Sequence, residues 1–120
     1  MLELCPIEEV PTRAAGVGGD ARLFVLQTIV RDYLSPEQQT AYQRGLNDLI
    51  ADRPPGRVLW IELEVDPARG STDRIIILRV HAADRGGRIR TLVMARTHPH
   101  PRTLYVEPGQ PEGLVELLRD

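Results

Sequence analysis

The sequence predicts an α/β fold: one right-handed βαβ unit, followed by an antiparallel hairpin and a short C-terminal helix. Three observations predict it. Residues 23–30 form a compact apolar run without clean alternation, which is typical of a strand buried on both faces. A capped helical pattern follows, and residues 58–65 form a second apolar run. Because the connections are short, we expect parallel strands joined by a right-handed crossover.

The helix between these two strands has a clear start and a clear end. Ser35 can cap its first turn, Pro36 suits the first helical position, and Gln38 completes a capping box. Residues 53–56 read Arg-Pro-Pro-Gly and end the helix near residue 51. Apolar side chains at helical spacing predict the face that packs on the sheet, namely Tyr42, Leu46, Leu49 and Ile50.

The remaining elements follow from alternation and from turn residues. The second half of the strand at residues 58–65 alternates, with Glu62 and Glu64 on one face. We expect strands at residues 74–81 and 88–96 around a turn at 83–87, an extended piece at 103–106 and a helix at 112–119. Prolines and glycines within residues 1–20 predict a loose N-terminal arm before a single α/β domain at residues 21–120.

Composition limits the class of protein. The chain has 120 residues, of which 42% are hydrophobic and 27% charged, enough for one domain with a core of its own. The single cysteine excludes an intrachain disulfide and a Cys-rich zinc site. No apolar run reaches the roughly 20 residues of a membrane span. The first ten residues carry three glutamates and no basic residue, so we expect no signal peptide and a cytoplasmic location.

The basic residues are unusual because all fifteen are arginine. Codon bias in a GC-rich genome is one interpretation, and a phosphate- or nucleic-acid-binding surface is the alternative, because arginine contacts phosphate bidentately. However, the net charge is −2 and the arginines are spread among acids. With one Phe, one Trp and three Tyr, the chain also offers little for bases to stack on. We therefore expect no nucleic-acid partner.

Three segments together carry a resemblance to a known family. They are Val30-Arg31-Asp32-Tyr33-Leu34-Ser35-Pro36-Glu37-Gln38, Val58-Leu59-Trp60-Ile61-Glu62-Leu63-Glu64 and His98-Pro99-His100-Pro101-Arg102. In order and spacing they resemble the C-terminal part of an uncharacterised, mostly actinobacterial family, the domain of unknown function 2332. Members of that family are several times longer and look like a methyltransferase-type Rossmann domain with extra helices in front. The resemblance implies a partial, Rossmann-like and methyltransferase-like C-terminal half, and it implies no established reaction.

The chain departs from the family pattern at several positions. Gln27 stands where the family has a histidine, Arg31-Asp32 replaces a Trp-Gln pair, and Pro101 replaces a glycine. The half that would carry a glycine-rich cofactor loop and a ribose-binding acid lies outside the resemblance. We therefore expect no cofactor.

Open α/β sheets bind ligands beyond the carboxyl ends of their parallel strands. Glu64 resembles the family glutamate and is the candidate catalytic acid or base, because burial among apolar neighbours would raise its pKa. The candidate ligand-binding residues are Gln27, Asp32, Tyr33, Glu62 and His100. The alternative is that Glu62 and Glu64 form a solvated strand face.

Two further features have simpler alternatives. His98 and His100 flank Pro99 and could share a metal, but no third ligand is fixed by the sequence. A surface loop stiffened by proline is the more common case, so we expect no metal. Trp60 is expected in the core rather than at a ligand.

Two hypotheses for function follow. In the first, the chain is a non-catalytic truncated or split half of a methyltransferase-like domain. It would associate with itself or with an upstream-encoded partner, because an exposed sheet edge needs pairing. In the second, the chain is a small enzyme or ligand-binding protein that uses Glu64, Asp32 and Tyr33. Neither hypothesis involves a membrane.

Overall fold

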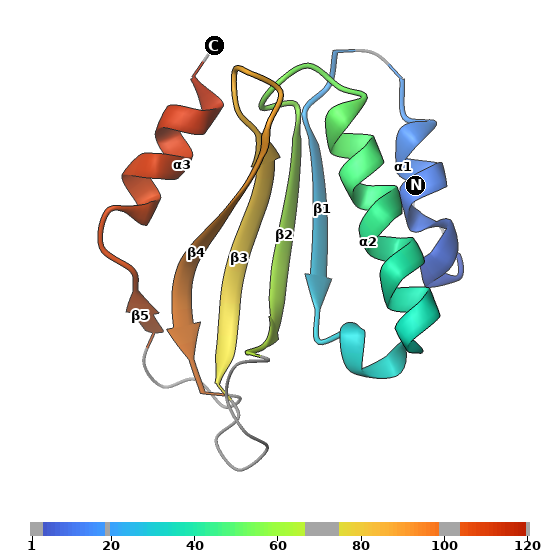
Figure 1. Ribbon diagram of the computed structural model, residues 1–120, viewed down its shortest axis with the longest axis horizontal. Helices are drawn as coiled ribbons and strands as arrows, with labels where there is room; N and C mark the ends of the chain where they lie inside the picture. Colours follow the sequence, from blue (N-terminus) through green and yellow to red (C-terminus); the bar gives the residue numbers. More distant parts are fainter. Residues whose placement is uncertain (1–3, 19, 67–74, 99–103, 120) are drawn as a thin grey trace.

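The structure is a computed structural model that describes residues 4–18, 20–66, 75–98 and 104–119. Within these ranges the chain forms one mixed sheet of five strands in the order β1-β2-β3-β4-β5 (Figure 1). The strands are β1 Leu23–Thr28, β2 Val58–Val65, β3 Ile76–Ala83, β4 Ile89–Thr97 and β5 Leu104–Val106.

The strand pairing confirms most of the predicted topology. β1 pairs with β2 in parallel, and β3 pairs with β4 as an antiparallel hairpin. β3 also lies directly beside β2, antiparallel to it, and β5 adds an antiparallel edge to β4. The described sheet thus has a single parallel pair, whereas a Rossmann sheet is mostly parallel. The fold class is α/β with a mixed sheet.

The helix between the parallel strands is α2, Pro36–Ala51, and it begins as the sequence predicts. The Gln38 amide donates to Ser35 Oγ over 3.2 Å, and the Ser35 amide donates to Gln38 Oε1 over 2.9 Å. This reciprocal cap satisfies two backbone donors at the first turn. The predicted apolar face is buried against the sheet, and the resulting core consists of Tyr42, Leu46, Leu49 and Ile50 of α2 with Val25, Val58, Trp60 and Ala83 of the strands.

The prediction of a loose N-terminal arm is wrong for residues 7–15. This segment forms a 3₁₀ turn, η1 Ile7–Glu9, and a helix, α1 Val10–Ala15, which packs beside α2. Pro11 lies in the first turn of α1, where its missing amide proton leaves no hydrogen bond unmade. Its buried ring lies over Gly45, where an added Cβ would come within 2.8 Å of Pro11 Cβ. The proline therefore starts a helix here instead of breaking one.

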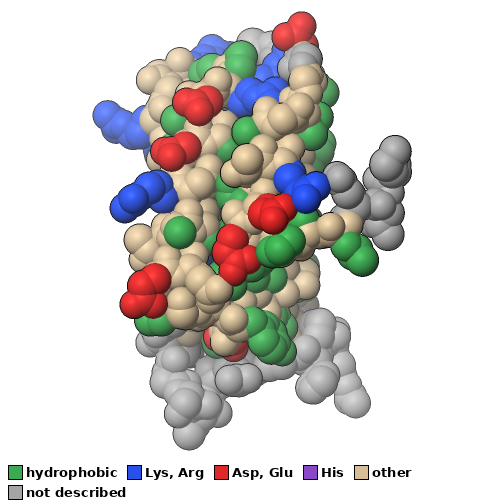
Figure 2. Space-filling model, turned by 90° about the vertical axis from the view of Figure 1, so that its right-hand side faces the viewer, with side chains coloured by type: hydrophobic (Ala, Val, Ile, Leu, Met, Phe, Trp, Pro, Cys, Tyr) green, Lys and Arg blue, Asp and Glu red, His purple; other side chains and the backbone are tan. Residues whose placement is uncertain are grey.

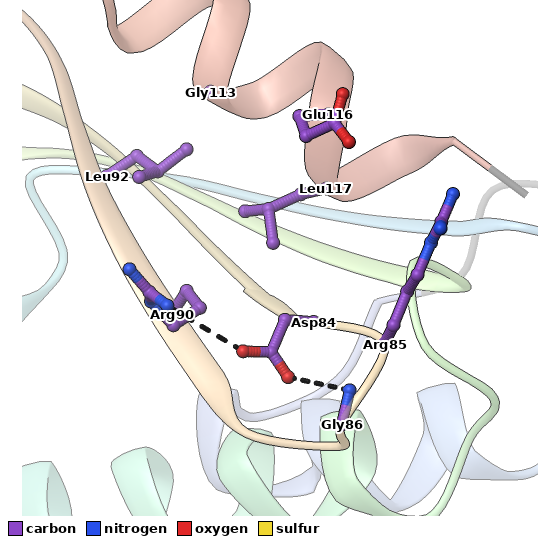
Figure 3. Close-up of a pocket in the computed structure, with 8 residues that line it drawn as sticks. All are labelled: Asp84, Arg85, Gly86, Arg90, Leu92, Gly113, Glu116 and Leu117. Carbon is purple, nitrogen blue, oxygen red and sulfur yellow. Dashed lines mark hydrogen bonds and ion pairs between the residues drawn. The ribbon is translucent and has the colours of Figure 1, made fainter.

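The C-terminal helix, α3 Gln110–Leu118, lies on the face of the sheet opposite to α2. Gly113 approaches Leu92 of β4, and Leu117 approaches Gly56 before β2. A cavity of about 450 Å³ remains between α3 and the β3–β4 turn (Figure 3). Asp84 borders this cavity, but its carboxylate already accepts the Gly86 amide of the turn over 3.0 Å. Among the described residues, none of the helices has the length and apolar character of a membrane span.

The two faces of the β1–β2 region differ in cover. α1 and α2 lie over one face, which we call the covered face, and their outer surface carries interspersed charges of both signs (Figure 2). On the opposite side, which we call the open face, Phe24 and Leu26 of β1 are 64% and 69% exposed. Ile61 and Leu63 of β2 lie beside them and are half-buried.

Candidate functional site

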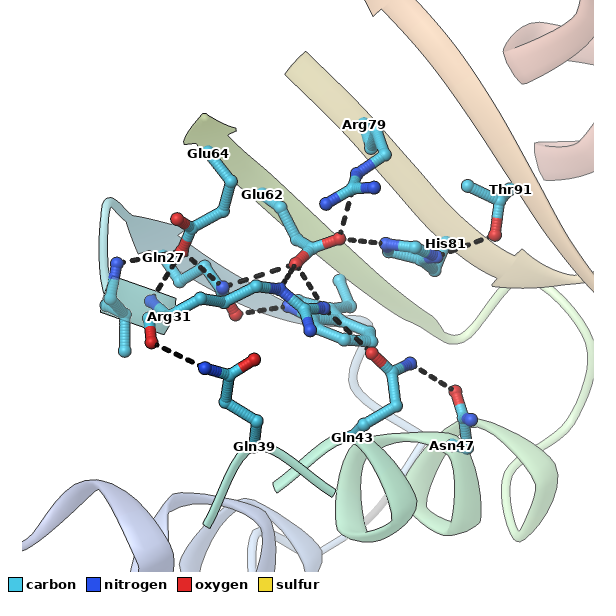
Figure 4. Close-up of polar contacts among 12 residues, drawn as sticks. Gln27, Arg31, Gln39, Gln43, Asn47, Glu62, Glu64, Arg79, His81 and Thr91 are labelled. Carbon is cyan, nitrogen blue, oxygen red and sulfur yellow. Dashed lines mark hydrogen bonds and ion pairs between the residues drawn. The ribbon is translucent and has the colours of Figure 1, made fainter. Parts of the chain in front are cut away.

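A cavity of about 470 Å³ lies between α2, the short 3₁₀ turn η2 Arg31–Tyr33, and strands β2 to β4. Polar side chains from all of these elements converge on it (Figure 4). Its lining consists of Arg31, Asp32, Gln39, Gln43, Glu62, Glu64, Val65, Arg79, His81 and Thr91. The cavity is thus built on the covered face, beyond the apolar core formed by α2 and Trp60.

The side chain of Glu62 is the centre of the polar cluster and is fully buried. Its Oε1 accepts hydrogen bonds from Arg31 Nη2 over 2.6 Å and from Arg31 Nε over 2.8 Å. Its Oε2 accepts from His81 Nε2 and lies 3.2 Å from Arg79 Nε. A buried carboxylate is tolerated only when it is paired in this way, so Glu62 organises the surrounding cationic groups.

Charge on Glu62 is favoured by these partners. Burial by itself raises the pKa of this carboxyl, but hydrogen bonds from His81 and Arg31 and the charges of Arg31 and Arg79 lower it below its ordinary value. On the α2 side, burial and the charge of Glu62 raise the pKa of Tyr42 to about 12. Glu62 is therefore ionised at neutral pH and Tyr42 is a neutral phenol.

The carboxylate of Glu64 fastens the turn that follows β1. Its Oε1 accepts from Gln27 Nε2 over 2.7 Å, from the Val30 amide over 2.8 Å and from the Arg31 amide over 3.2 Å. The chain reaches this geometry through Ile29, whose φ of 47° is unusual for a β-branched residue. Glu64 thus holds a strained turn in place, and that turn directs Arg31 toward Glu62.

Arg31 connects the turn to α2. Its Nη2 donates to Gln43 Oε1 over 2.7 Å, and its carbonyl oxygen accepts from Gln39 Nε2 over 3.0 Å. Gln43 Nε2 in turn donates to Asn47 Oδ1 over 3.3 Å. The polar side of α2 is therefore bound to the site through its amide side chains.

His81 is held on three sides. Its ring stacks on Trp60 at 4.3 Å between centroids and an interplanar angle of 27°. Its Nε2 faces Glu62, and its Nδ1 lies 2.7 Å from Thr91 Oγ1. Trp60 Nε1 donates to Gln27 Oε1 over 2.7 Å. Trp60 lies in the core as predicted, and it also orients the imidazole of His81.

The comparison with known families gives one result. The profile of a family described as "Uncharacterized protein conserved in bacteria (DUF2332)" matches residues 2–105. The chain belongs to this family. The matched DUF2332 segment contains every residue that lines the cavity at Glu62. No curated protein and no solved structure matches the chain.

Within the DUF2332 segment, the structure brings together some of the predicted site residues. Gln27, Glu62 and Glu64 are buried, and Gln27 donates a hydrogen bond to each carboxylate, so the alternative of a solvated strand face is wrong. α2 covers the face on which they lie. Asp32 is exposed at the cavity wall, Tyr33 is 84% exposed and is not part of the lining, and His100 lies outside the described residues.

Seven residues of the lining were not among the predicted ones: Arg31, Gln39, Gln43, Val65, Arg79, His81 and Thr91. For Arg79, His81 and Thr91, the signal that could have found them is strand register. Arg79 and His81 alternate on β3 as Glu62 and Glu64 do on β2, and an antiparallel pairing places them opposite Glu62 and Trp60. Thr91 lies opposite His81 on β4.

The arrangement suits hydrogen bonding to a ligand better than metal binding. Among the described residues, no group of three His, Cys, Asp or Glu side chains is placed to hold a metal ion. Arg79 offers guanidinium donors at the cavity wall. Its buried Nε makes no hydrogen bond to any described residue, because its approach to Glu62 has poor hydrogen-bond geometry.

Proposed function

We propose that this chain binds a small molecule that presents an oxygen acceptor, above all a carboxylate, in the cavity at Glu62. This proposal keeps the second hypothesis from the sequence, a ligand-binding protein, but assigns the binding to other residues than Glu64, Asp32 and Tyr33. Arg79 contacts the ligand, Glu62 orients Arg79, and Gln39 and Gln43 add amide groups to the wall. Glu62 itself is fully occupied by its partners and does not contact the ligand.

One observation carries this proposal, namely the unmatched hydrogen-bond donor of Arg79. Buried donors in native proteins have partners in the great majority of cases, and an exception calls for an explanation. Arg79 Nε is such an exception within the described part of the chain, because it forms an ion pair with Glu62 Oε2 at 3.2 Å but no hydrogen bond, and the side chain of Arg79 lines a cavity of about 470 Å³. A carboxylate matches the planar fork of a guanidinium in geometry and charge, so it is the group that best completes Arg79.

Thermal unfolding in the presence of acetate, benzoate and inorganic phosphate tests the proposal. A compound at 100 times its Kd should raise the free energy of unfolding by about 2.7 kcal/mol. The shift should disappear in Arg79→Gln and weaken in Arg79→Lys, which keeps the charge but loses the planar fork.

Arg90→Gln is the matched control, because Arg90 is exposed and its guanidinium lies 3.7 Å from Asp84 in an ion pair at the surface. It should leave the shift unchanged. The proposal fails if none of the compounds shifts unfolding, or if the shift survives in Arg79→Gln.

A second function, association through the open face, is favoured by a separate observation. Phe24 and Leu26 expose 64% and 69% of their surface side by side on β1, an edge strand of the described sheet. Apolar side chains beside an unpaired strand edge are typical of a surface that another chain covers. In this proposal the chain is the non-catalytic half of a larger methyltransferase-like domain, completed by a second copy or by a separately encoded partner.

Light scattering after size-exclusion chromatography tests self-association. The mass at micromolar concentration should exceed that of one chain and should fall to it in the double variant Phe24→Thr, Leu26→Thr. Threonine keeps the β-propensity of the strand. A wild-type chain that stays monomeric at all concentrations contradicts self-association. Co-expression with neighbouring open reading frames then tests the separately encoded partner.

A further inference from the structure

Three side chains on neighbouring strands form a line of hydrogen bonds at the cavity. Glu62 comes from β2, His81 from β3 and Thr91 from β4. His81 Nε2 faces Glu62 Oε2, and His81 Nδ1 lies 2.7 Å from Thr91 Oγ1 (Figure 4). His81 and Thr91 are direct partners in the antiparallel register, so the sheet itself sets their separation.

The protonation pattern of this line follows from Glu62. The partners of Glu62 keep its pKa low, so its carboxylate only accepts hydrogen bonds. The proton of a neutral His81 ring therefore lies on Nε2, which leaves a lone pair on Nδ1. The Thr91 hydroxyl donates to that lone pair. Stacking on Trp60 holds the ring in this orientation.

We propose that Glu62, His81 and Thr91 form a nucleophilic relay that hydrolyses esters of small carboxylic acids, with Thr91 as the nucleophile. An oriented carboxylate, a base and a hydroxyl within hydrogen-bonding reach of one another are the signature of an activated nucleophile. The inference rests on the proposed function, because the acid released is the ligand class that Arg79 binds.

Position supports Thr91 as the reacting group. The residue is exposed and lines the cavity, so a substrate can reach its hydroxyl. Arg79 pairs with Val93, two residues along β4 from Thr91, so both side chains project from the same face of the sheet. A long side chain spans such a diagonal. The guanidinium can therefore bind the carbonyl oxygen of an ester under attack at Thr91.

The chemistry balances with water as the second reactant. Thr91 Oγ forms a bond to the acyl carbon, and the proton of the hydroxyl moves to His81 Nδ1. The carbon–oxygen bond to the leaving alcohol breaks, and His81 returns the proton to that oxygen. Water then attacks the acyl-threonine with His81 as base, which releases the carboxylic acid and restores the hydroxyl. Arg79 stabilises the negative oxygen in both steps.

Hydrolysis of para-nitrophenyl acetate by the whole chain tests the relay. Thr91→Val should lower kcat/KM by about 100-fold or more, in the range found for loss of an activated group. Thr91→Ser should keep most of the activity. Thr91 is exposed, so we expect these variants to fold, and circular dichroism checks this. Tandem mass spectrometry of the quenched wild-type reaction should locate the acetyl group on Thr91.

Matched controls separate the relay from background reactivity. Thr12→Val removes another exposed hydroxyl, and His98→Asn removes an exposed imidazole that could react without a site. Neither should change the rate. Unchanged hydrolysis in Thr91→Val, or an acetyl group found only elsewhere, overturns the relay.

The same samples, tested for acetate and benzoate binding, distinguish the two proposals. Binding without hydrolysis overturns the relay and leaves the proposed function intact. Hydrolysis that depends on Thr91, without carboxylate binding, supports the relay and contradicts the proposed ligand. Absence of both overturns both.

Discussion

The two faces of the β1–β2 region reverse the usual relation between polarity and burial. On the covered face, Gln27, Glu62 and Glu64 are polar and buried. On the open face, Phe24 and Leu26 are apolar and exposed. The covered face tolerates its charges because Glu62 is paired with Arg31 and Arg79 and because Glu64 accepts three hydrogen bonds. The open face retains apolar surface because no described helix lies over it. The difference underlies the two proposals, a ligand site on one side of the strands and an interface on the other.

The largest expected effect is on the covered face. Glu62→Gln removes a buried negative charge and leaves Arg31 and Arg79 without their shared partner. We expect a loss of about 3–5 kcal/mol in the free energy of unfolding, as for other broken buried ion pairs. Urea unfolding measures it, and Glu116→Gln, at an exposed pair with Arg119, should stay within about 0.5 kcal/mol of the wild type. A loss below about 1 kcal/mol for Glu62→Gln would mean that the cluster contributes little.

The same carboxylate sets a dependence of stability on pH. The pKa of Glu62 is lower in the folded chain than its ordinary value of 4.5. The carboxylate therefore makes its full contribution to the free energy of unfolding above pH 4.5. The stabilisation is lost as the pH falls through the folded pKa. Unfolding by urea at a series of pH values from 7 downward should therefore show that the free energy of unfolding falls more steeply with decreasing pH in the wild type than in Glu62→Gln. Parallel curves for the two proteins would contradict the assignment.

A smaller effect on stability tests how closely the helices pack at two of their glycines. Alanine at a helical glycine usually stabilises by about 0.5–1 kcal/mol, and Gly113→Ala in α3 should do so, because the new Cβ would lie 3.9 Å from Leu92. Gly45→Ala in α2 should instead destabilise by about 1–3 kcal/mol, because its Cβ would press on Pro11. Thermal unfolding compares the two. An increase in stability at both positions would show that α1 shifts to accommodate the new Cβ at little cost.

The smallest effect is expected on the open face. Phe24→Thr and Leu26→Thr should each change the free energy of unfolding of a monomer by no more than about 0.5 kcal/mol, because little of either side chain is buried. Equilibrium unfolding at low protein concentration measures this. A loss of several kcal/mol would show that the open face is part of a core, and the contrast between the faces would disappear.

Local signals in the sequence predict the covering helix and the positions of the strands correctly. The prediction that β1 is buried on both faces is wrong, because Phe24 and Leu26 on its open face are exposed. Ser35, Pro36 and Gln38 specify the start of α2 without help from distant residues. Alternation along β2 correctly separates Glu62 and Glu64 from Leu63, but it does not say which of the two faces α2 covers. Helix α1 is missed because prolines and glycines within residues 1–20 predict a loose arm, although a proline in a first turn favours a helix.

The candidate site was harder to predict because it depends on register. His81 and Thr91 are ten residues apart, and only the hairpin pairing makes them partners. Arg79 reaches Glu62 only because β3 returns directly beside β2. The prediction that Glu64 is a catalytic group stays a prediction, and its hydrogen bonds from the backbone amides of Val30 and Arg31 show that it also fixes the turn after β1.

Arg31 has a consequence for how the chain opens. Its backbone amide donates to Glu64, and Nη2 of its guanidinium donates both to Glu62 and to Gln43 of α2. The turn, the strand and the helix therefore separate as one cooperative unit and not one by one. In hydrogen exchange, the amide protons of Val30 and Arg31 should be as slow as those in the middle of α2, although they belong to a connection between secondary-structure elements.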